Sequence, residues 1–139
     1  MTGLWVVLGV LAAGLLAGFV LQAREGRIRG GSDKPARELP APVTEALGPG
    51  VTLVQISTTF CAPCRHARAR LGAMAEQHDG LRHVDLDVTH EPEVAHALGV
   101  LRTPTTIAYT ASGEELLRVS GLPEAPALLG ALEPHLATR

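Results

Sequence analysis

The first 23 residues carry no charged side chain, and this run constrains the fold more than any other feature of the chain. Residues 3–21 are apolar throughout, and as a helix rising ~1.5 Å per residue they would span roughly 28 Å, close to the ~30 Å hydrocarbon core of a bilayer. A small folded domain has no place for a helix that is apolar on every side. Residues 1–23 are therefore predicted to form a transmembrane anchor.

A cleaved signal peptide is the alternative interpretation of this run. Signal peptides carry basic residues before a shorter apolar stretch and end at a cleavage site of small residues. In this chain the first basic residue, Arg24, comes after the stretch, and residues 21–23 make a poor cleavage site. The anchor is therefore the preferred interpretation.

The basic residues after the anchor predict its orientation. Lys and Arg close to a membrane span stay on the cytoplasmic side. We therefore expect a single-pass protein of the cell membrane whose N-terminus lies outside and whose folded domain lies in the cytoplasm. The basic residues that support this orientation are Arg24, Arg27, Arg29, Lys34 and Arg37.

Residues 24–42 are polar and rich in glycine and proline, a composition typical of a flexible linker. Residues 43–139 alternate between strand and helix patterns, which predicts one α/β domain with a mixed sheet covered by helices. From residue 41 onward the chain has seven basic and eleven acidic groups, a mildly acidic balance that argues against a nucleic-acid partner. The expected strands are 51–56, 81–88, 105–109 and 114–119, and the expected helices follow Cys61 and cover 91–98 and 125–136, with a further short helix near 43–47.

The chain has two cysteines, Cys61 and Cys64, placed where the first strand of the expected domain passes into a helix. A C-x-x-C pair in a β-α-β context is typical of a redox site. Cys61 falls at the helix N-terminus, where unpaired N–H groups and the helix dipole favour a thiolate, and Arg65 and His66 add positive potential. Such surroundings can lower a cysteine pKa from ~8.5 to about 7 or less. Cys61 is therefore the expected nucleophile.

The second cysteine lies on the apolar side of the same helix. Cys64, Ala67, Leu71 and Met74 recur at helical spacing, so this face should be buried. A sheltered Cys64 beside an accessible Cys61 suits disulfide exchange, in which one thiolate attacks and the other resolves the mixed disulfide. Cys64 is therefore the expected resolving thiol, and the two cysteines form the expected redox disulfide.

Other uses of this cysteine pair fit less well. A zinc site normally has four ligands, whereas Cys61, Cys64 and His66 supply three at most, and their helical directions diverge. A structural disulfide closing so short a loop would stabilise little, especially in a reducing compartment. Covalent haem attachment needs a histidine directly after the second cysteine, but Arg65 stands there. We expect no metal site.

Two segments match the motifs of one known family. They are Phe60-Cys61-Ala62-Pro63-Cys64 and Thr103-Pro104-Thr105, followed by glycines at Gly113 and Gly121. With these motifs the chain from about residue 50 to 136 resembles thioredoxin, and together with its anchor it resembles membrane-anchored thioredoxin-like proteins of actinobacteria. The resemblance implies a thioredoxin fold, with a cis-proline at Pro104 facing the dithiol.

The resemblance also implies the activity and the partners. It implies thiol–disulfide exchange with protein disulfides, no bound cofactor, and an electron donor such as a thioredoxin reductase. Residues at the matching positions would contact the substrate chain. They are Phe60, Pro63, Thr103, Pro104 and Gly121.

Several positions depart from the pattern of the family. Phe60 stands in place of a tryptophan, Ala62 of a glycine and Ser57 of an aromatic residue. Gln55 replaces the buried aspartate that assists the second cysteine, and His83 replaces a buried lysine. Glutamine cannot accept a proton as a carboxylate does, so Gln55 is either a core hydrogen-bonding residue or part of an altered path for the proton. His83 titrates near neutral pH, which leaves it either a candidate for proton handling or a surface histidine.

The sequence as a whole predicts a membrane-tethered protein thiol–disulfide oxidoreductase that acts as a disulfide reductase. One alternative is an outward-facing domain that isomerises disulfides or supports cytochrome maturation. Another is a binding or scaffold protein that keeps the fold with little turnover, for which the glutamine at position 55 is the best argument.

Overall fold

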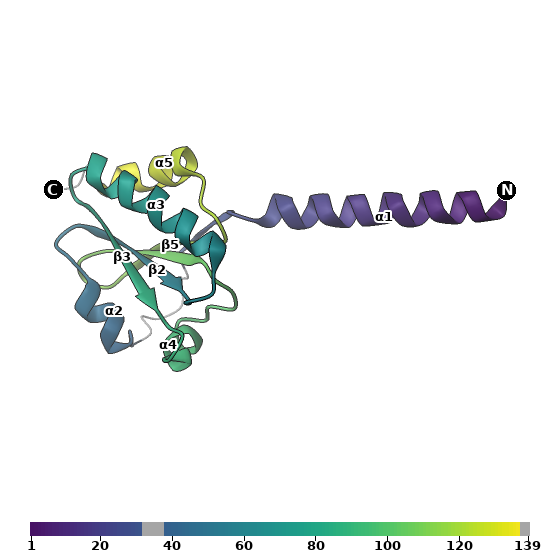
Figure 1. Cartoon of the computed structure of the whole chain (residues 1–139). Coiled ribbons are helices and arrows are strands. Elements are labelled where there is room, and N and C mark those ends of the chain that lie inside the picture. Colours follow the sequence, from purple (N-terminus) through teal and green to yellow (C-terminus); the bar gives the residue numbers. More distant parts are fainter. Residues whose placement is uncertain (32–37, 137–139) are drawn as a thin grey trace.

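The computed structural model describes residues 1–31 and 38–136. Helix α1 (Thr2–Arg24) extends from one side of the rest of the chain, and none of its residues is buried (Figure 1). By length and composition this helix is apolar enough to cross a membrane, in agreement with the apolar run at residues 3–21.

The described residues after α1 form a mixed five-stranded sheet in the order β1-β5-β4-β2-β3. Strands β2 and β3 are parallel and are connected through helix α3, whereas all other neighbours are antiparallel and β4 and β5 form a hairpin. The predicted mixed sheet is thereby confirmed. The strands are β1 (Ile28–Gly30), β2 (Val51–Ser57), β3 (Leu81–Asp87), β4 (Thr105–Tyr109) and β5 (Glu115–Ser120), and the helices are α2 (Ala41–Ala46), α3 (Ala62–Gln77), α4 (Pro92–Ala97) and α5 (Ala125–Leu136).

Both faces of the sheet are covered. Figure 1 shows α3 and α5 over one face and α2 and α4 over the other. Successive side chains of β2 enter two separate cores: Leu53 packs with residues of α3 and α5, and Val54 and Ile56 pack with residues of α2 and α4. Burial on both faces is the reason that this strand reads as an almost continuous apolar run.

Strand β1 corrects the prediction that residues 24–42 form a flexible linker. Ile28 pairs with Val119 of β5, and its side chain packs against the core on the α3 side. A segment of only three strand residues is too short for a readable alternation of apolar and polar side chains, and the open edge of β5 offers the backbone partners that order it. The expected linker residues 32–37, including Lys34 and Arg37, lie outside the described part of the chain.

Candidate active site

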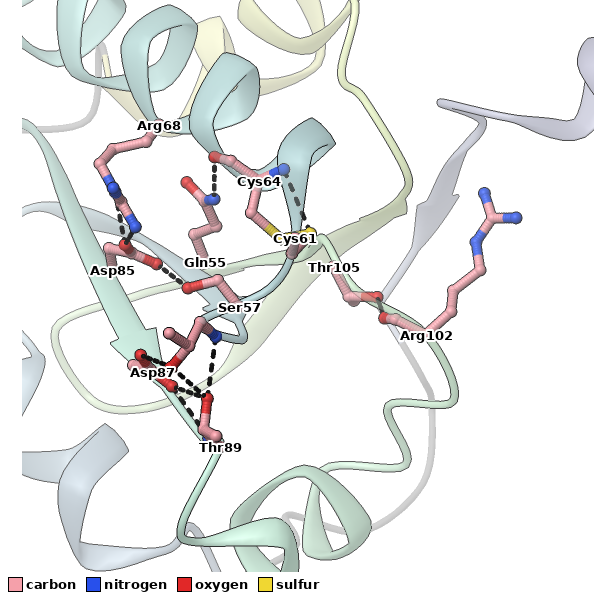
Figure 2. The surroundings of a disulfide bond; sticks show 11 residues. Gln55, Ser57, Cys61, Cys64, Arg68, Asp85, Asp87, Thr89, Arg102 and Thr105 are labelled. Atoms are coloured by element: carbon pink, nitrogen blue, oxygen red, sulfur yellow. Dashed lines mark hydrogen bonds and ion pairs between the residues drawn. A yellow bond between two sulfur atoms is a disulfide. The ribbon is translucent and has the colours of Figure 1, made fainter.

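The two cysteines form a disulfide at the start of α3 (Figure 2). Cys61 is the N-cap residue, and its sulfur accepts a hydrogen bond from the backbone N–H of Cys64 at 3.2 Å. Pro63 occupies the first turn, where a missing N–H costs nothing because helix-start N–H groups lack intrahelical partners. The predicted position of Cys61 at the helix N-terminus is therefore confirmed.

The two sulfur-bearing residues differ in exposure. Cys64 is 1% exposed and belongs to the buried face of α3, as expected, whereas Cys61 is partly exposed. Among residues 1–31 and 38–136, no group of three or more His, Cys, Asp or Glu is arranged to hold a metal ion.

Hydrogen bonds fix the segment that leads into Cys61. The backbone N–H of Thr59 donates to the Thr89 hydroxyl at 2.9 Å, and the Thr59 hydroxyl donates to Asp87 Oδ2 at 3.3 Å. Hydrogen bonds from the Thr89 hydroxyl and backbone N–H hold the pKa of Asp87 below its usual value. Sequence reasoning missed this network, although Asp87-Val88-Thr89 after a strand is a recognisable turn motif in which the aspartate accepts from the residue two positions on.

A second loop is ordered beside the dithiol. The Thr103–Pro104 peptide bond is cis, and Pro104 is buried. The Pro104 carbonyl accepts a 2.7 Å hydrogen bond from the N–H of Gly121, which has a φ of +86°. The Thr105 hydroxyl donates to the carbonyl oxygen of Arg102 at 2.7 Å. The cis-proline loop is thus held by Thr105, at the start of β4, and by Gly121, directly after β5.

A hollow of about 310 Å³ brings together most of the residues expected to contact substrate. Pro63, Thr103, Pro104 and Gly121 line it, whereas Phe60 does not and instead stands 95% exposed. The remaining lining residues come from four separate segments of the chain, and sequence reasoning did not assign them to substrate contact. They are Glu25, His66, Arg102 and Leu122.

Gln55 and His83 meet beneath α3. Gln55 is fully buried, and its side-chain nitrogen donates to the Cys64 carbonyl at 2.9 Å, so its Oε1 faces His83 Nε2, also at 2.9 Å. Burial lowers the pKa of His83, partly opposed by the negative charge of Asp85. Within residues 38–136 no hydrogen bond joins Gln55 or His83 to a sulfur atom. His83 is thus not a free surface histidine, and Gln55 contacts the backbone of the buried cysteine.

An ion pair lies next to this pair of residues. Arg68 donates through Nε to Asp85 at 2.6 Å, and the Ser57 hydroxyl also donates to Asp85 (Figure 2). Asp85 lies on the face of β3 that α3 covers, so it is partly buried. Parallel pairing sets Asp85 beside Gln55 and His83 beside Leu53, which explains how the polar residues gather there.

The sequence profile of the thioredoxin family matches residues 44–133. The chain is 30% identical over 60 residues to thioredoxin Asp f 28 of Aspergillus fumigatus, covering 43% of this chain and 56% of that protein. It is 33% identical over 88 residues to the thioredoxin of Staphylococcus saprophyticus, covering 63% of this chain and 84% of that protein.

A solved structure also resembles this fold. The structure of a mutant thioredoxin from Halobacterium salinarum superposes with a TM-score of 0.63 at 24% identity, covering 78% of this chain and 99% of that one. This likeness confirms the expected thioredoxin fold. The family profile covers well over half of the chain and includes both cysteines and the cis-proline loop. The chain therefore belongs to the thioredoxin family.

Proposed function

We propose that this thioredoxin-family redox protein is a membrane-tethered protein disulfide reductase in which Cys61 is the nucleophile and Cys64 the resolving thiol. The observation that carries the assignment is the contrast between the two cysteines: Cys61 caps α3 and is partly exposed, whereas Cys64 is 1% exposed. An attacking thiolate must reach its substrate, and a resolving thiol need only reach its neighbour.

The exchange proceeds in two steps. The Cys61 thiolate attacks one sulfur of a substrate disulfide, and the second substrate sulfur leaves as a thiolate that takes up a proton. Cys64, once deprotonated, attacks the Cys61 sulfur and releases the first substrate sulfur, leaving the Cys61–Cys64 disulfide. Two electrons have passed from the dithiol to the substrate. A reductant partner, which family membership implies, then restores the dithiol.

Backbone geometry supports the role of Cys61. The Cys64 N–H that donates to the Cys61 sulfur at 3.2 Å would also stabilise the Cys61 thiolate, because a hydrogen bond to the charged form favours that form. The α3 N-terminus adds the positive end of the helix dipole. Both effects assist Cys61 as an attacking group and as a leaving group.

The hollow lined by Pro63, Thr103, Pro104 and Gly121 is the proposed binding site for the substrate chain around its disulfide. Phe60, which precedes Cys61 in the chain and is 95% exposed, is a proposed apolar contact for the same substrate chain. Gln55 is assigned a structural role because it binds the backbone of Cys64, so water takes the proton of the Cys64 thiol. His83 holds Gln55 in place through their 2.9 Å hydrogen bond.

Tethering and orientation complete the proposal. Helix α1 provides the anchor, and the basic residues that follow it support a cytoplasmic domain. Facing the cytoplasm, the dithiol would meet a reducing environment, which suits a reductase rather than an oxidase or isomerase.

The test compares two single-cysteine variants in cells. Cys64→Ser lacks the resolving thiol, so its Cys61 mixed disulfide has no internal exit and should accumulate partner proteins that a reductant releases. Cys61→Ser is the matched control and should trap few. Purified wild-type protein, reduced beforehand, should also reduce insulin. Equal trapping by both variants, or no insulin reduction by the wild type, would rule the proposal out in favour of a binding protein with little turnover.

A further inference from the structure

The end of α1 is docked on the sheet edge rather than joined to the domain by a free linker. The N–H of Gly26 donates to the Ser120 carbonyl at 2.9 Å, and pairing with β5 begins at Ile28. Gly26 has a φ of +69°, and a Cβ there would lie 2.6 Å from the Leu122 carbonyl oxygen, so glycine is required at this close approach. Glu25 is the one residue between α1 and this contact.

This contact lies at the end of the sheet that carries the dithiol. Strand β2 runs towards Cys61, and β4, antiparallel to β2, begins at this end with Thr105. Strand β5 is antiparallel to β4 and so ends here at Ser120, where β1 begins. Figure 1 shows α1 leaving the domain on the side of the N-terminal end of α3.

The hollow beside the dithiol reaches the end of α1. Glu25, directly after the helix, lines the same 310 Å³ hollow as Pro63 and Pro104. Arg102 lies between the cis-proline loop and the ribbon that enters β1 (Figure 2), with Nη1 3.8 Å from Glu25 Oε1. The proposed substrate site and the end of the anchor are therefore neighbours.

The connection is too short to move the domain away from a bilayer. The two residues from Arg24 to Gly26 can extend at most ~7 Å, which is comparable with the thickness of one headgroup layer. With α1 inserted, the dithiol end of the domain lies at the membrane surface, while the β4–β5 turn lies at the far end of the sheet.

Two exposed apolar side chains belong to the loops at the dithiol end of the sheet. Within the described residues beyond α1, two large apolar side chains stand almost fully exposed: Phe60 at 95% and Leu101 at 98%. Phe60 precedes Cys61, and Leu101 precedes Arg102 in the loop of the cis-proline. Exposed apolar groups that flank a binding site are typical of a surface that contacts a partner.

We propose that the α1–β1 junction holds the dithiol against the membrane surface and that the substrates are membrane proteins whose disulfides lie within a few residues of the bilayer. The proposal deepens the reductase function above and rests on it, because it requires α1 to span the membrane. The exchange itself is unchanged: two electrons pass from Cys61 and Cys64 to the partner's disulfide, whose two sulfurs leave as thiols.

Vesicles containing the full-length protein and a membrane-spanning peptide provide the test. The peptide carries a disulfide loop either directly after its span or after a stalk of about 30 Gly/Ser residues, chosen to extend well beyond the headgroups. The protein is reduced and freed of reductant before it is placed in vesicles with one peptide or the other, and single-turnover rates are measured. The wild type should reduce the disulfide near the surface at least about five-fold faster, because both reactive groups share one layer and have a higher effective concentration.

Two insertion variants test whether the preference for the near disulfide depends on the α1–β1 junction or only on the length of the chain. A 12-residue Gly/Ser spacer between Arg24 and Glu25 frees the domain by roughly 20 Å and should abolish the preference. The same spacer between residues 34 and 35 leaves the contacts of Gly26 and β1 on the anchor side and should preserve it. Equal wild-type rates for the two peptides, or a preference that survives the first insertion, would overturn the proposal.

Insulin reduction by the same samples distinguishes a failure of the reductase function from a failure of the proposed placement at the membrane. A wild type that reduces neither insulin nor peptide contradicts the reductase function, whereas one that reduces insulin but shows no preference contradicts only the placement.

Fluorescence energy transfer to a dye on the lipid headgroups gives an independent measure of the distance between the dithiol and the membrane surface. A donor on Cys61 in Cys64→Ser should transfer more strongly than a donor on Ser112→Cys in a Cys61→Ser, Cys64→Ser background, and the reverse order would refute the placement.

Discussion

The side-chain nitrogen of Gln55 donates a 2.9 Å hydrogen bond to the carbonyl oxygen of Cys64. This contact ties the centre of the sheet to the helical turn that carries the buried cysteine, and His83 completes it by bonding the other end of the amide. Gln55 and His83 lie on the neighbouring strands β2 and β3 beneath α3, and Cys64 is part of α3 itself. The polar residues at this site therefore serve first to position the helix of the dithiol.

Replacing Gln55 should therefore destabilise the domain. In Gln55→Leu the contacts with Cys64 and His83 are lost, and the free energy of unfolding should fall by about 1–3 kcal/mol, the usual cost of leaving buried polar groups without partners. Denaturant unfolding of the oxidised protein in detergent, followed by circular dichroism, measures the change. Thr106→Val is the control, since Thr106 is equally buried and its hydroxyl has no partner within the described residues. A larger loss in the control would contradict this account.

His83 should make stability depend on pH. Burial lowers its pKa from 6.5, so as the pH falls through 6.5 the unfolded chain binds a proton more readily than the folded one. Wild-type stability should therefore fall from pH 7.5 to 5.5, and His83→Asn should fall less over the same range. Denaturation midpoints at several pH values give the two slopes. Identical slopes would mean that His83 titrates alike in both states.

The anchor junction should tolerate one glycine substitution and not another. Gly26→Ala forces a side chain into a left-handed backbone conformation and against the Leu122 carbonyl, which should cost about 1–2 kcal/mol or release β1 from the sheet. Gly30→Ala, at the other end of β1, meets no atom within 4 Å and should be nearly neutral. Hydrogen exchange at the N–H of residue 26, which is bonded to Ser120, reports the docking. Slow exchange retained in Gly26→Ala would contradict the expected strain.

The orientation of the domain can be read from fusions after Arg139. Alkaline phosphatase is active only outside the cytoplasm, and a cytoplasmic fluorescent protein matures only inside. The basic residues after α1 lead us to expect a fluorescent cell and an inactive phosphatase. An active phosphatase with a dark fluorescent fusion would place the domain outside and favour the isomerase or cytochrome-maturation alternative over a reductase.

Much of the architecture could be predicted from local sequence patterns. The uncharged run at residues 3–21 identifies α1 because length and hydropathy alone decide whether a helix can span a membrane. The apolar run of β2 and the stripe through Cys64 identify buried surfaces of a strand and a helix, and Cys61 is placed at the helix N-terminus by its position between them. These features depend on neighbours within one or two turns of the chain.

Only the tertiary structure decided which distant residues meet. Strand β1 forms because β5 offers an open edge, and no local pattern in Ile28–Gly30 predicts this strand. His83 becomes a partner of Gln55 because parallel pairing aligns β3 with β2 under α3, and Glu25 reaches the hollow of Pro104 because β1 docks where the dithiol lies. The physical reason is common to all three: backbone pairing between strands far apart in sequence sets side-chain neighbours that the order of residues does not encode.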